Sequence, residues 1–195
     1  MIANNVLTRY YIDMANAASS LLSRLARIVA SEGYEHGLKP VQLQALRYLA
    51  NANRFSRTPR ALTAWLGQTK GTVSQTIASL ERRGLIVRSG DVRDRRIIRL
   101  EMTKAGLAVV RMVGDVAEAM LAHLDDDERA TAEVLLGKML GGHVAARGSR
   151  PMGICHTCRY FQLGEAPATS HRCSLLDVPL DNDDAQRVCI EQEAA

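Results

Sequence analysis

The chain has 195 residues, of which 47% are hydrophobic and 24% charged, and its formal net charge is +4 at pH 7. This composition is that of a globular protein, so it excludes the disordered, collagen-like and purely coiled-coil classes. No apolar stretch approaches the roughly 18 residues that a membrane-spanning helix requires, and the N-terminus lacks the basic and apolar pattern of a secretion signal. We therefore expect a cytoplasmic protein that binds no membrane.

The charges are unevenly distributed along the chain. Residues 54–104 contain 12 lysines and arginines against four acidic residues, whereas residues 151–195 contain three arginines against seven acidic residues. A basic segment of this kind favours a polyanionic partner such as DNA, although a solvated basic surface would give the same composition.

The first part of the chain has the three-to-four spacing of apolar residues that is typical of amphipathic helices. This spacing predicts a helix over residues 7–29, ended by Gly33 and Gly37. A second helix is predicted from Pro40, which suits the first turn, to the polar segment 51–53.

The next two predicted helices form a helix-turn-helix pattern. The first should start at Pro59 after the N-cap Thr58 and end at Gly67. Its predicted inward residues are Leu62, Trp65 and Leu66. A three-residue turn separates it from a helix over residues 70–83. With Val73 facing the core, the opposite side of that helix is small and polar, as a DNA groove requires, although a plain surface helix could look the same.

Two β-branched segments, residues 85–88 and 97–102, predict a β-hairpin. The loop between them is polar and carries three arginines. Arginines at the tip of a hairpin suit the phosphate backbone or the narrow minor groove of DNA, and simple solvation of a basic loop is the alternative.

Long helices are predicted after the hairpin. The apolar spacing from Thr103 predicts one helix that continues almost to Asp125. Asp125 and Glu128 then form a capping-box pattern for a further helix, whose apolar side continues to Val144. The glycines 141–142 and the segment 148–151 should break the chain, and residues 145–154 are expected to be a linker. These helices have more apolar surface than a small winged domain can cover, so we expect a second subunit to pack against them.

The order of these elements and the amino-acid sequences of three segments resemble those of the MarR family of winged helix-turn-helix transcription regulators. The segments are Gly71-Thr72-Val73-Ser74, Leu80-Glu81-Arg82-Arg83-Gly84-Leu85-Ile86-Val87-Arg88, and Asp94-Arg95-Arg96 through Leu100-Glu101-Met102-Thr103. The resemblance covers about residues 7–145. It implies a homodimer on an inverted-repeat operator, with the helices 70–83 in successive major grooves and the wing arginines in the flanking minor grooves. Asp94 would then position arginines rather than contact DNA.

The resemblance and the predicted surface together indicate a sequence-specific DNA-binding regulator, more specifically a repressor. The candidate DNA-contacting residues are Thr69, Lys70, Thr72, Ser74, Gln75, Arg82, Arg93, Arg95 and Arg96. Members of the family often bind a small, commonly aromatic effector. Residues that could line such a pocket here are Tyr10, Tyr11, Met14 and Tyr48, although residues of these types at helical spacing are usually core. An enzyme lacks support, because the sequence has no phosphate-binding glycine loop and no nucleophile–base motif.

All four cysteines lie near the C-terminus with the spacing C-x2-C-x14-C-x15-C: Cys155, Cys158, Cys173 and Cys189. Four thiolates suit a tetrahedral zinc ion, which is our first expectation, and they also suit an iron–sulfur cluster. A disulfide or free thiols are the remaining alternatives. Should one cysteine not be a ligand, His171 is the expected substitute, with His156 also nearby in the sequence.

The predicted fold class is mostly α (α+β), a winged helix-turn-helix with long dimerisation helices and a small C-terminal metal-binding element. The predicted regions are an N-terminal dimerisation helix (1–36), the DNA-binding domain (37–104), C-terminal dimerisation helices (105–147) and a cysteine-rich tail (148–195). The metal site is expected to be structural or sensory. The alternatives are an iron–sulfur redox or iron sensor and a tail that serves as a protein-interaction module.

Overall fold

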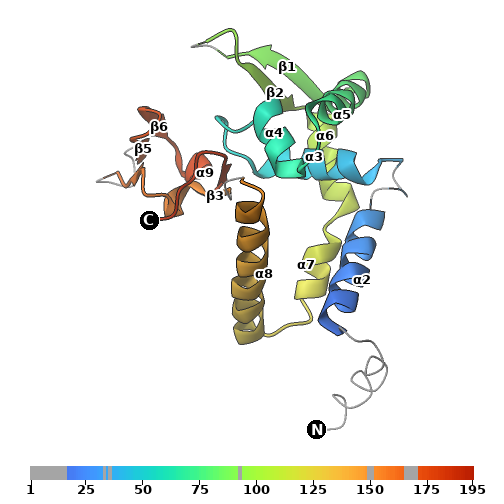
Figure 1. Ribbon diagram of the computed structural model, residues 1–195. Helices are drawn as coiled ribbons and strands as arrows, with labels where there is room; N and C mark the ends of the chain where they lie inside the picture. Colours follow the sequence, from blue (N-terminus) through green and yellow to red (C-terminus); the bar gives the residue numbers. More distant parts are fainter. Residues whose placement is uncertain (1–16, 33, 35–36, 92–93, 149–151, 165–170) are drawn as a thin grey trace.

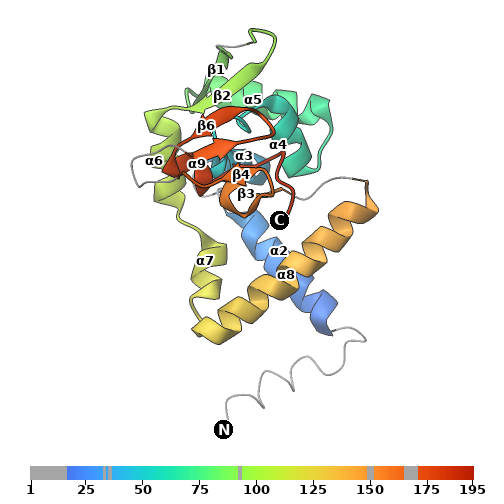
Figure 2. The same ribbon diagram turned by 90° about the vertical axis from the view of Figure 1, so that its left-hand side faces the viewer.

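The computed structural model describes most of the chain as a winged domain, a set of long helices and a C-terminal tail. The described residues are 17–32, 34, 37–91, 94–148, 152–164 and 171–195. In Figure 1 the winged domain is at the top, the long helices extend below it, and the tail lies at its left. In the view of Figure 2, the tail lies in front of the winged domain.

The winged domain consists of a helix-turn-helix followed by an antiparallel hairpin. Its elements are α3 (Pro40–Asn51), α4 (Pro59–Leu66), α5 (Lys70–Arg82), β1 (Ile86–Gly90), β2 (Ile98–Met102) and α6 (Lys104–Val113). In the hairpin, Ile86 pairs with Met102 and Gly90 with Ile98. The core is formed by side chains from all these elements, including Leu46, Leu49, Leu62, Ile77, Leu80, Ile86 and Leu100. The predicted order of helices and hairpin is therefore confirmed.

Local capping determines where α4 and α5 begin. The Thr58 hydroxyl accepts a hydrogen bond from the backbone N–H of Ala61, and the Thr69 hydroxyl accepts one from Thr72, both at 3.2 Å. Each bond satisfies an N–H group that has no partner within its helix. Gly67 ends α4 with a φ of +60°, a backbone conformation that favours glycine.

The prediction that Trp65 points into the core is wrong. Leu62 is fully buried, but the Trp65 side chain is 45% exposed. Its ring lies 5.2 Å from that of Tyr48, centroid to centroid, so it covers the edge of the core from outside. A large aromatic ring at this edge gains contact area without entering the closely packed interior.

The single long helix predicted after the hairpin is also wrong, because the chain breaks at Gly114. α6 ends just before this residue and α7 (Val116–Leu121) follows it. Gly114 has a φ of +71°, which an α-helix does not permit. The carboxylate of Asp115 then caps α7 by accepting hydrogen bonds from the backbone N–H groups of Ala117 and Glu118, at 3.0 and 3.2 Å.

An ion pair fixes this break to the rest of the fold. Arg47 Nη1 lies 2.7 Å from Glu32 Oε2, and the two side chains are only 17% and 9% exposed. Arg47 also donates to the carbonyl of Gly114 at 2.5 Å, while Glu32 Oε1 accepts the N–H of Val116 at 2.7 Å. The hydrogen bond from Arg47 lowers the pKa of Glu32, which keeps the carboxylate charged at neutral pH.

Helix α2 (Ala17–Ser31) coincides with the second half of the first predicted helix. Residues 7–16 of that prediction lie outside the described residues. The large apolar side chains of α2 are 39–46% exposed in the single chain: Leu21, Leu22, Leu25 and Ile28. None of the helices that the structure describes is long and apolar enough to cross a membrane.

Helix α8 (Asp126–Ala146) begins with the predicted capping box. The Asp125 carboxylate accepts the N–H of Glu128 at 2.9 Å, and the Glu128 carboxylate accepts the N–H of Asp125 at 3.1 Å. The helix ends at Ala146, close to the start of the predicted linker at residue 145, and the glycines 141–142 do not interrupt it. Neither glycine has a positive φ, so each adopts ordinary helical geometry.

The tail contains two small antiparallel sheets and two short helical turns. Its elements are β3 (Gly153–Ile154), η2 (Cys155–Thr157), β4 (Phe161–Gln162), β5 (His171–Cys173), β6 (Val178–Leu180), α9 (Asn182–Ala185) and β7 (Val188–Cys189). β3 pairs with β7, and β4, β5 and β6 form the other sheet. Strands of two or three residues are too short to be stable alone, so the tail depends on its cysteine cluster and on the winged domain.

Candidate nucleic-acid interface and cysteine cluster

The outer side of α5 has the small, polar character that the sequence predicts. Val73, Ile77 and Leu80 face the core and are at most 2% exposed. The residues on the other side are exposed: Lys70, Gly71, Thr72, Ser74, Gln75 and Arg82. Thr69, the N-cap, is also exposed and shares a hydrogen bond of 2.9 Å with the hydroxyl of Thr72. Hydroxyl, amide and cationic groups therefore line one side of this helix with little bulk.

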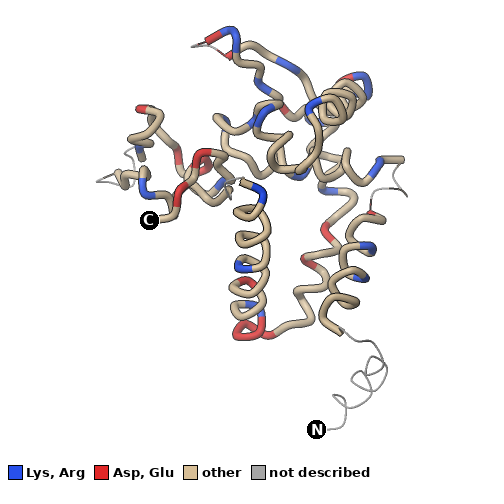
Figure 3. The backbone as a smooth tube through the Cα atoms, viewed as in Figure 1, with Lys and Arg blue, Asp and Glu red and all other residues tan. Residues whose placement is uncertain are grey.

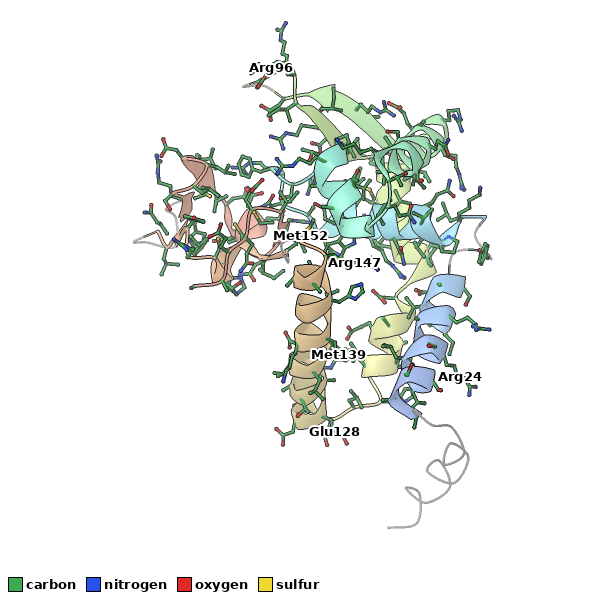
Figure 4. All side chains as sticks on the ribbon, in the orientation of Figure 1. Arg24, Arg96, Glu128, Met139, Arg147 and Met152 are labelled. Carbon is green, nitrogen blue, oxygen red and sulfur yellow. The ribbon has the colours of Figure 1, made fainter. Side chains whose placement is uncertain are left out.

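The hairpin tip carries the basic side chains predicted for a wing. Arg95 and Arg96 are exposed, and Figure 4 shows Arg96 extending from the tip away from the molecule. Arg93 lies outside the described residues. The Asp94 carboxylate accepts two bonds of 2.9 Å from the Arg96 guanidinium and one of 3.0 Å from its backbone N–H. These bonds lower the pKa of Asp94, so a charged carboxylate orients Arg96.

The basic segment is not wholly directed toward a DNA partner, which corrects the simplest interpretation of its charge. Arg54 forms ion pairs with Asp181, at 3.1 Å, and with the buried Asp184 of the tail. Arg57 lies 3.4 Å from Glu101 of β2. In Figure 3, acidic residues of the tail lie toward the winged domain. Part of the positive charge therefore balances the acidic tail within the same chain.

Comparisons with known proteins agree with this arrangement. Residues 36–97 match the MarR family model. S. aureus MepR in its DNA-binding conformation has a TM-score of 0.57 to this chain at 23% identity, covering 64% of this chain and 96% of that chain. S. aureus MepR in complex with DNA has a TM-score of 0.53 at 22% identity, covering 64% and 97%. The chain thus has a MarR-type winged-helix fold, and the tail lies outside the segment that the family model matches.

The tail of the chain brings all four cysteines into one neighbourhood. Cys155 and Cys158 form a tight turn in which the N–H of Cys158 donates to the carbonyl of Cys155 at 3.1 Å. Cys173 pairs with Phe161 in the strand after this turn, and Cys189 pairs with Gly153 in the strand before it. Three of the four are at most 8% exposed and share one apolar cluster. All four are free thiols.

The Cys155 and Cys189 thiols are hydrogen-bonded to each other, and this contact separates their acidities. It raises the pKa of Cys155, which is the donor, and lowers the pKa of Cys189 to about 6. The polar side chains of Asn53 and Ser56 and the backbone at Glu191 also lower the pKa of Cys189. Cys189 is therefore the cysteine most readily held as a thiolate, the form that binds metals.

The predicted metal site is supported by donor chemistry but not by a finished coordination shell. Four thiols, three of them buried, form a donor set that suits zinc or an iron–sulfur cluster. Within the part of the chain that the structure describes, no group of three or more His, Cys, Asp or Glu side chains is placed so that it could hold a metal ion. The metal site therefore stays a prediction.

Neither histidine considered as a substitute ligand points to the cysteines. His171 Nδ1 accepts the N–H of Gly164 at 3.2 Å, and His171 Nε2 lies 2.8 Å from Asn182 Oδ1. His156 Nδ1 lies 3.2 Å from the carbonyl of Ala185. Each ring thus hydrogen-bonds to the backbone or to an amide side chain of the tail, and this arrangement does not favour a histidine ligand.

Asn53 and Ser56 are site residues that sequence reasoning missed. They are 1% and 0% exposed, yet the sequence around them indicates only the end of α3. Their partner Cys189 is more than 130 residues away in the chain, so no local pattern could have found them. A run of polar residues that becomes fully buried is itself a sign of a specific contact, because buried polar groups are almost always hydrogen-bonded.

The predicted effector pocket is not defined by the described residues. Tyr10, Tyr11 and Met14 lie outside them. Tyr48 is 2% exposed and donates to the carbonyl of Ser56 at 2.9 Å, so it belongs to the core. Burial accordingly raises its pKa. A small-molecule effector stays a prediction.

Proposed function

We propose that the protein is a DNA-binding transcription regulator of the cytoplasm that acts as a homodimeric repressor on an inverted-repeat operator. The observation that carries this proposal is that α5 and the basic hairpin tip lie at the same end of the molecule (Figure 1). A small polar helix surface suits the major groove, and wing arginines suit the adjacent backbone or minor groove. S. aureus MepR, which has the same fold, is solved in complex with DNA.

Two subunits would place two α5 helices about one turn of DNA apart, which predicts half-sites roughly 10 bp apart from centre to centre. The exposed apolar side chains of α2 and α8 support a second subunit, because monomers rarely expose so many large apolar residues. The first experiment is therefore selection of a high-affinity duplex from a random pool by the full-length protein, followed by footprinting. An enriched inverted repeat is the expected result.

The roles of helix and wing are separated by two substitutions. Gln75→Ala should weaken binding to the selected duplex by about 5- to 100-fold but leave binding to random DNA unchanged, because an amide on α5 can read base edges. Arg96→Ala should weaken both about equally and reduce the slope of log K against log salt by about 0.9, as expected for one lost phosphate contact. Fluorescence anisotropy over a salt series measures both effects.

Arg129→Ala, which removes an exposed arginine paired with Glu118 on the long helices, is the matched control and should leave binding unchanged. Equal losses on selected and random DNA for Gln75→Ala would contradict a reading role for that residue. Failure of the pool to enrich any sequence would contradict sequence-specific binding as a whole.

We also propose that the four cysteines bind a metal, with zinc as the first candidate and an iron–sulfur cluster as the second. The supporting observation is the gathering of four free thiols, three of them buried, around the Cys155–Cys189 contact. A bound metal would add the cohesion that so small a segment lacks. Zinc would be structural or sensory, whereas an iron–sulfur cluster would make the protein a redox or iron sensor.

Metal analysis of the full-length protein, purified without oxygen, decides between these proposals. We expect about one zinc per chain and a colourless protein. Brown protein with iron and acid-labile sulfide would identify the cluster instead. Cys158→Ser should lower the metal content, whereas His171→Asn should not. Protein with neither metal would contradict the metal site.

A further inference from the structure

The tail is joined to the winged domain through one short segment, residues 52–57, which we call the joint segment. Ala52 forms a β-bridge with Val188, and the N–H of Asn53 donates to the carbonyl of Val188 at 2.9 Å. The N–H of Ile190 donates to the hydroxyl of Ser56 at 3.0 Å. Val188 and Ile190 pack against the core of the winged domain. The strand that carries Cys189 is thus bonded to the joint segment on both sides of the cysteine.

Charged contacts hold the same junction. Arg54 Nη1 pairs with Asp181 and Asp184, and its Nη2 donates to the carbonyl of Pro179 at 2.6 Å. The Arg187 guanidinium, from the tail, donates to the carbonyl of Ala50. The Asp184 side chain is only 4% exposed, and a buried carboxylate needs a charged partner to be stable. The Arg54–Asp184 pair therefore differs from an ordinary ion pair on the surface.

Within the joint segment, Asn53 and Ser56 have fully buried polar side chains, and both residues are bonded to the neighbours of Cys189 in the chain, Val188 and Ile190. The Asn53 carboxamide oxygen also accepts the N–H of Ser56 at 2.8 Å, and the carbonyl of Ser56 accepts the hydroxyl of Tyr48. Groups that bond to the chain beside a ligand residue fix the position of that residue. The winged domain therefore supplies part of the surroundings of the cysteine cluster.

The outer side of the joint segment holds the wing. Arg99 Nη1 of β2 donates to the carbonyls of Arg54 and Phe55, at 3.2 and 2.5 Å. The N–H of Leu100 donates to the carbonyl of Arg57 at 2.8 Å. Arg99 also pairs with Asp91 at the base of the wing loop, and both side chains are at most 16% exposed. The position of β2 is therefore set by carbonyls of the same joint segment that is bonded to the residues on either side of Cys189.

We propose that the joint segment couples the cysteine cluster to the wing, so that metal binding or oxidation at the cysteines changes the affinity of the protein for DNA. This inference rests on the proposed DNA-binding function. A change in sulfur positions moves Cys189, and the buried bonds through Asn53 and Ser56 transmit that movement to the carbonyls that hold β2. Coupling is reciprocal, so bound DNA changes metal affinity at the cysteines by the same factor.

The test uses the full-length protein and the duplex selected above. Its dissociation constant is measured in three states: reduced and metal-free, supplied with one equivalent of Zn²⁺, and oxidised with diamide. Diamide takes two electrons and two protons from a pair of thiols as they form a disulfide, and mass spectrometry confirms each state. We expect the reduced metal-free protein to differ at least about fivefold in affinity from one or both of the other states.

A matched pair of wing variants tests the route of the coupling. Arg99→Lys keeps a positive charge, but its single ammonium group cannot both pair with Asp91 and reach the two carbonyls, as the separate guanidinium nitrogens do, so the affinity ratio between states should fall to about one. Arg88→Lys changes the other wing strand, where the arginine pairs with Glu81 at 3.2 Å, and should retain the wild-type ratio. Equal ratios in the two variants would overturn the proposed route.

Failure of this inference is distinguishable from failure of the proposed function. Tight duplex binding with the same affinity in all three states overturns the coupling and leaves the proposed function intact. The same conclusion follows if neither Zn²⁺ nor diamide alters the cysteines. Absence of binding to any duplex overturns the function. In that case, hydrogen exchange of residues 86–102 is compared between the three states. Exchange rates that differ between states support the coupling, and identical rates overturn it.

Discussion

Leu140→Asp is expected to convert the proposed dimer into a monomer. The central part of α8 presents five large apolar side chains that are 49–70% exposed in the single chain: Val134, Leu135, Leu136, Met139 and Leu140. Met139, labelled in Figure 4, lies midway along this helix. A carboxylate buried among such side chains without a partner is strongly unfavourable. Affinity for the selected duplex should fall about 100-fold or more, because two linked half-site contacts become one.

Sedimentation equilibrium at micromolar concentration measures the change in mass, and anisotropy measures the change in affinity. Lys138→Asp, which introduces the same carboxylate on the same helix at a position that is already charged, is the control and should remain dimeric. A monomeric wild-type protein, or a Leu140→Asp variant that remains dimeric, would contradict the proposed role of α8.

Helix starts were the features that sequence predicted best, because capping is a local interaction. Thr58, Thr69 and Asp125 each bond an N–H group within three residues along the chain, so the pattern alone identifies them. The break at Gly114 was missed because the apolar spacing continues on both sides of it. What decides the break is the contact with Arg47 and Glu32, which lie far away in the sequence.

The gathering of the cysteines followed from their spacing, but their attachment to the winged domain did not. Arg54 and Asp184 are separated by 130 residues, and nothing local to either indicates the other. The opposite charges of the basic and acidic segments are evident in the sequence. Composition alone, however, does not show whether the basic residues pair with acidic residues of the same chain or with DNA. The structure assigns part of that charge to the junction.

This attachment changes how the tail is best studied. Removal of the tail after residue 147 would uncover Ala52, Asn53 and Ser56, which are at most 1% exposed. A truncated protein would therefore combine loss of the cysteines with exposure of buried polar groups, and these effects cannot be separated by one measurement. Single substitutions at the cysteines or at Arg99 keep the covered surface and isolate the signal.

Gly106→Ala is expected to lower the free energy of unfolding by about 3 kcal/mol, the upper part of the usual range for overpacking. The backbone of α6 at this residue lies directly against Leu85, the residue that precedes β1. A Cβ atom at Gly106 would be 2.1 Å from the carbonyl oxygen of Leu85 and 3.3 Å from the Met102 methyl group. The nearer obstacle is backbone, so rotation of a side chain cannot relieve the contact.

The strain from this substitution should reach the wing. The Thr103 hydroxyl caps α6 at Gly106 N, at 3.0 Å, and the backbone N–H of Thr103 donates to the carbonyl of Leu85 at 3.1 Å. Any shift that admits the methyl group therefore moves α6 and the base of the hairpin apart. We expect weaker DNA binding even at temperatures where the variant remains folded.

Urea unfolding followed by circular dichroism measures the loss of stability, with Gly141→Ala as the control. A Cβ at Gly141 meets no atom within 4 Å, and alanine in a helix interior is favoured over glycine by about 1 kcal/mol. The same glycine-to-alanine change should thus stabilise α8 and destabilise the contact between α6 and Leu85. A Gly106→Ala protein as stable as the wild type would show that α6 does not pack this closely on the hairpin.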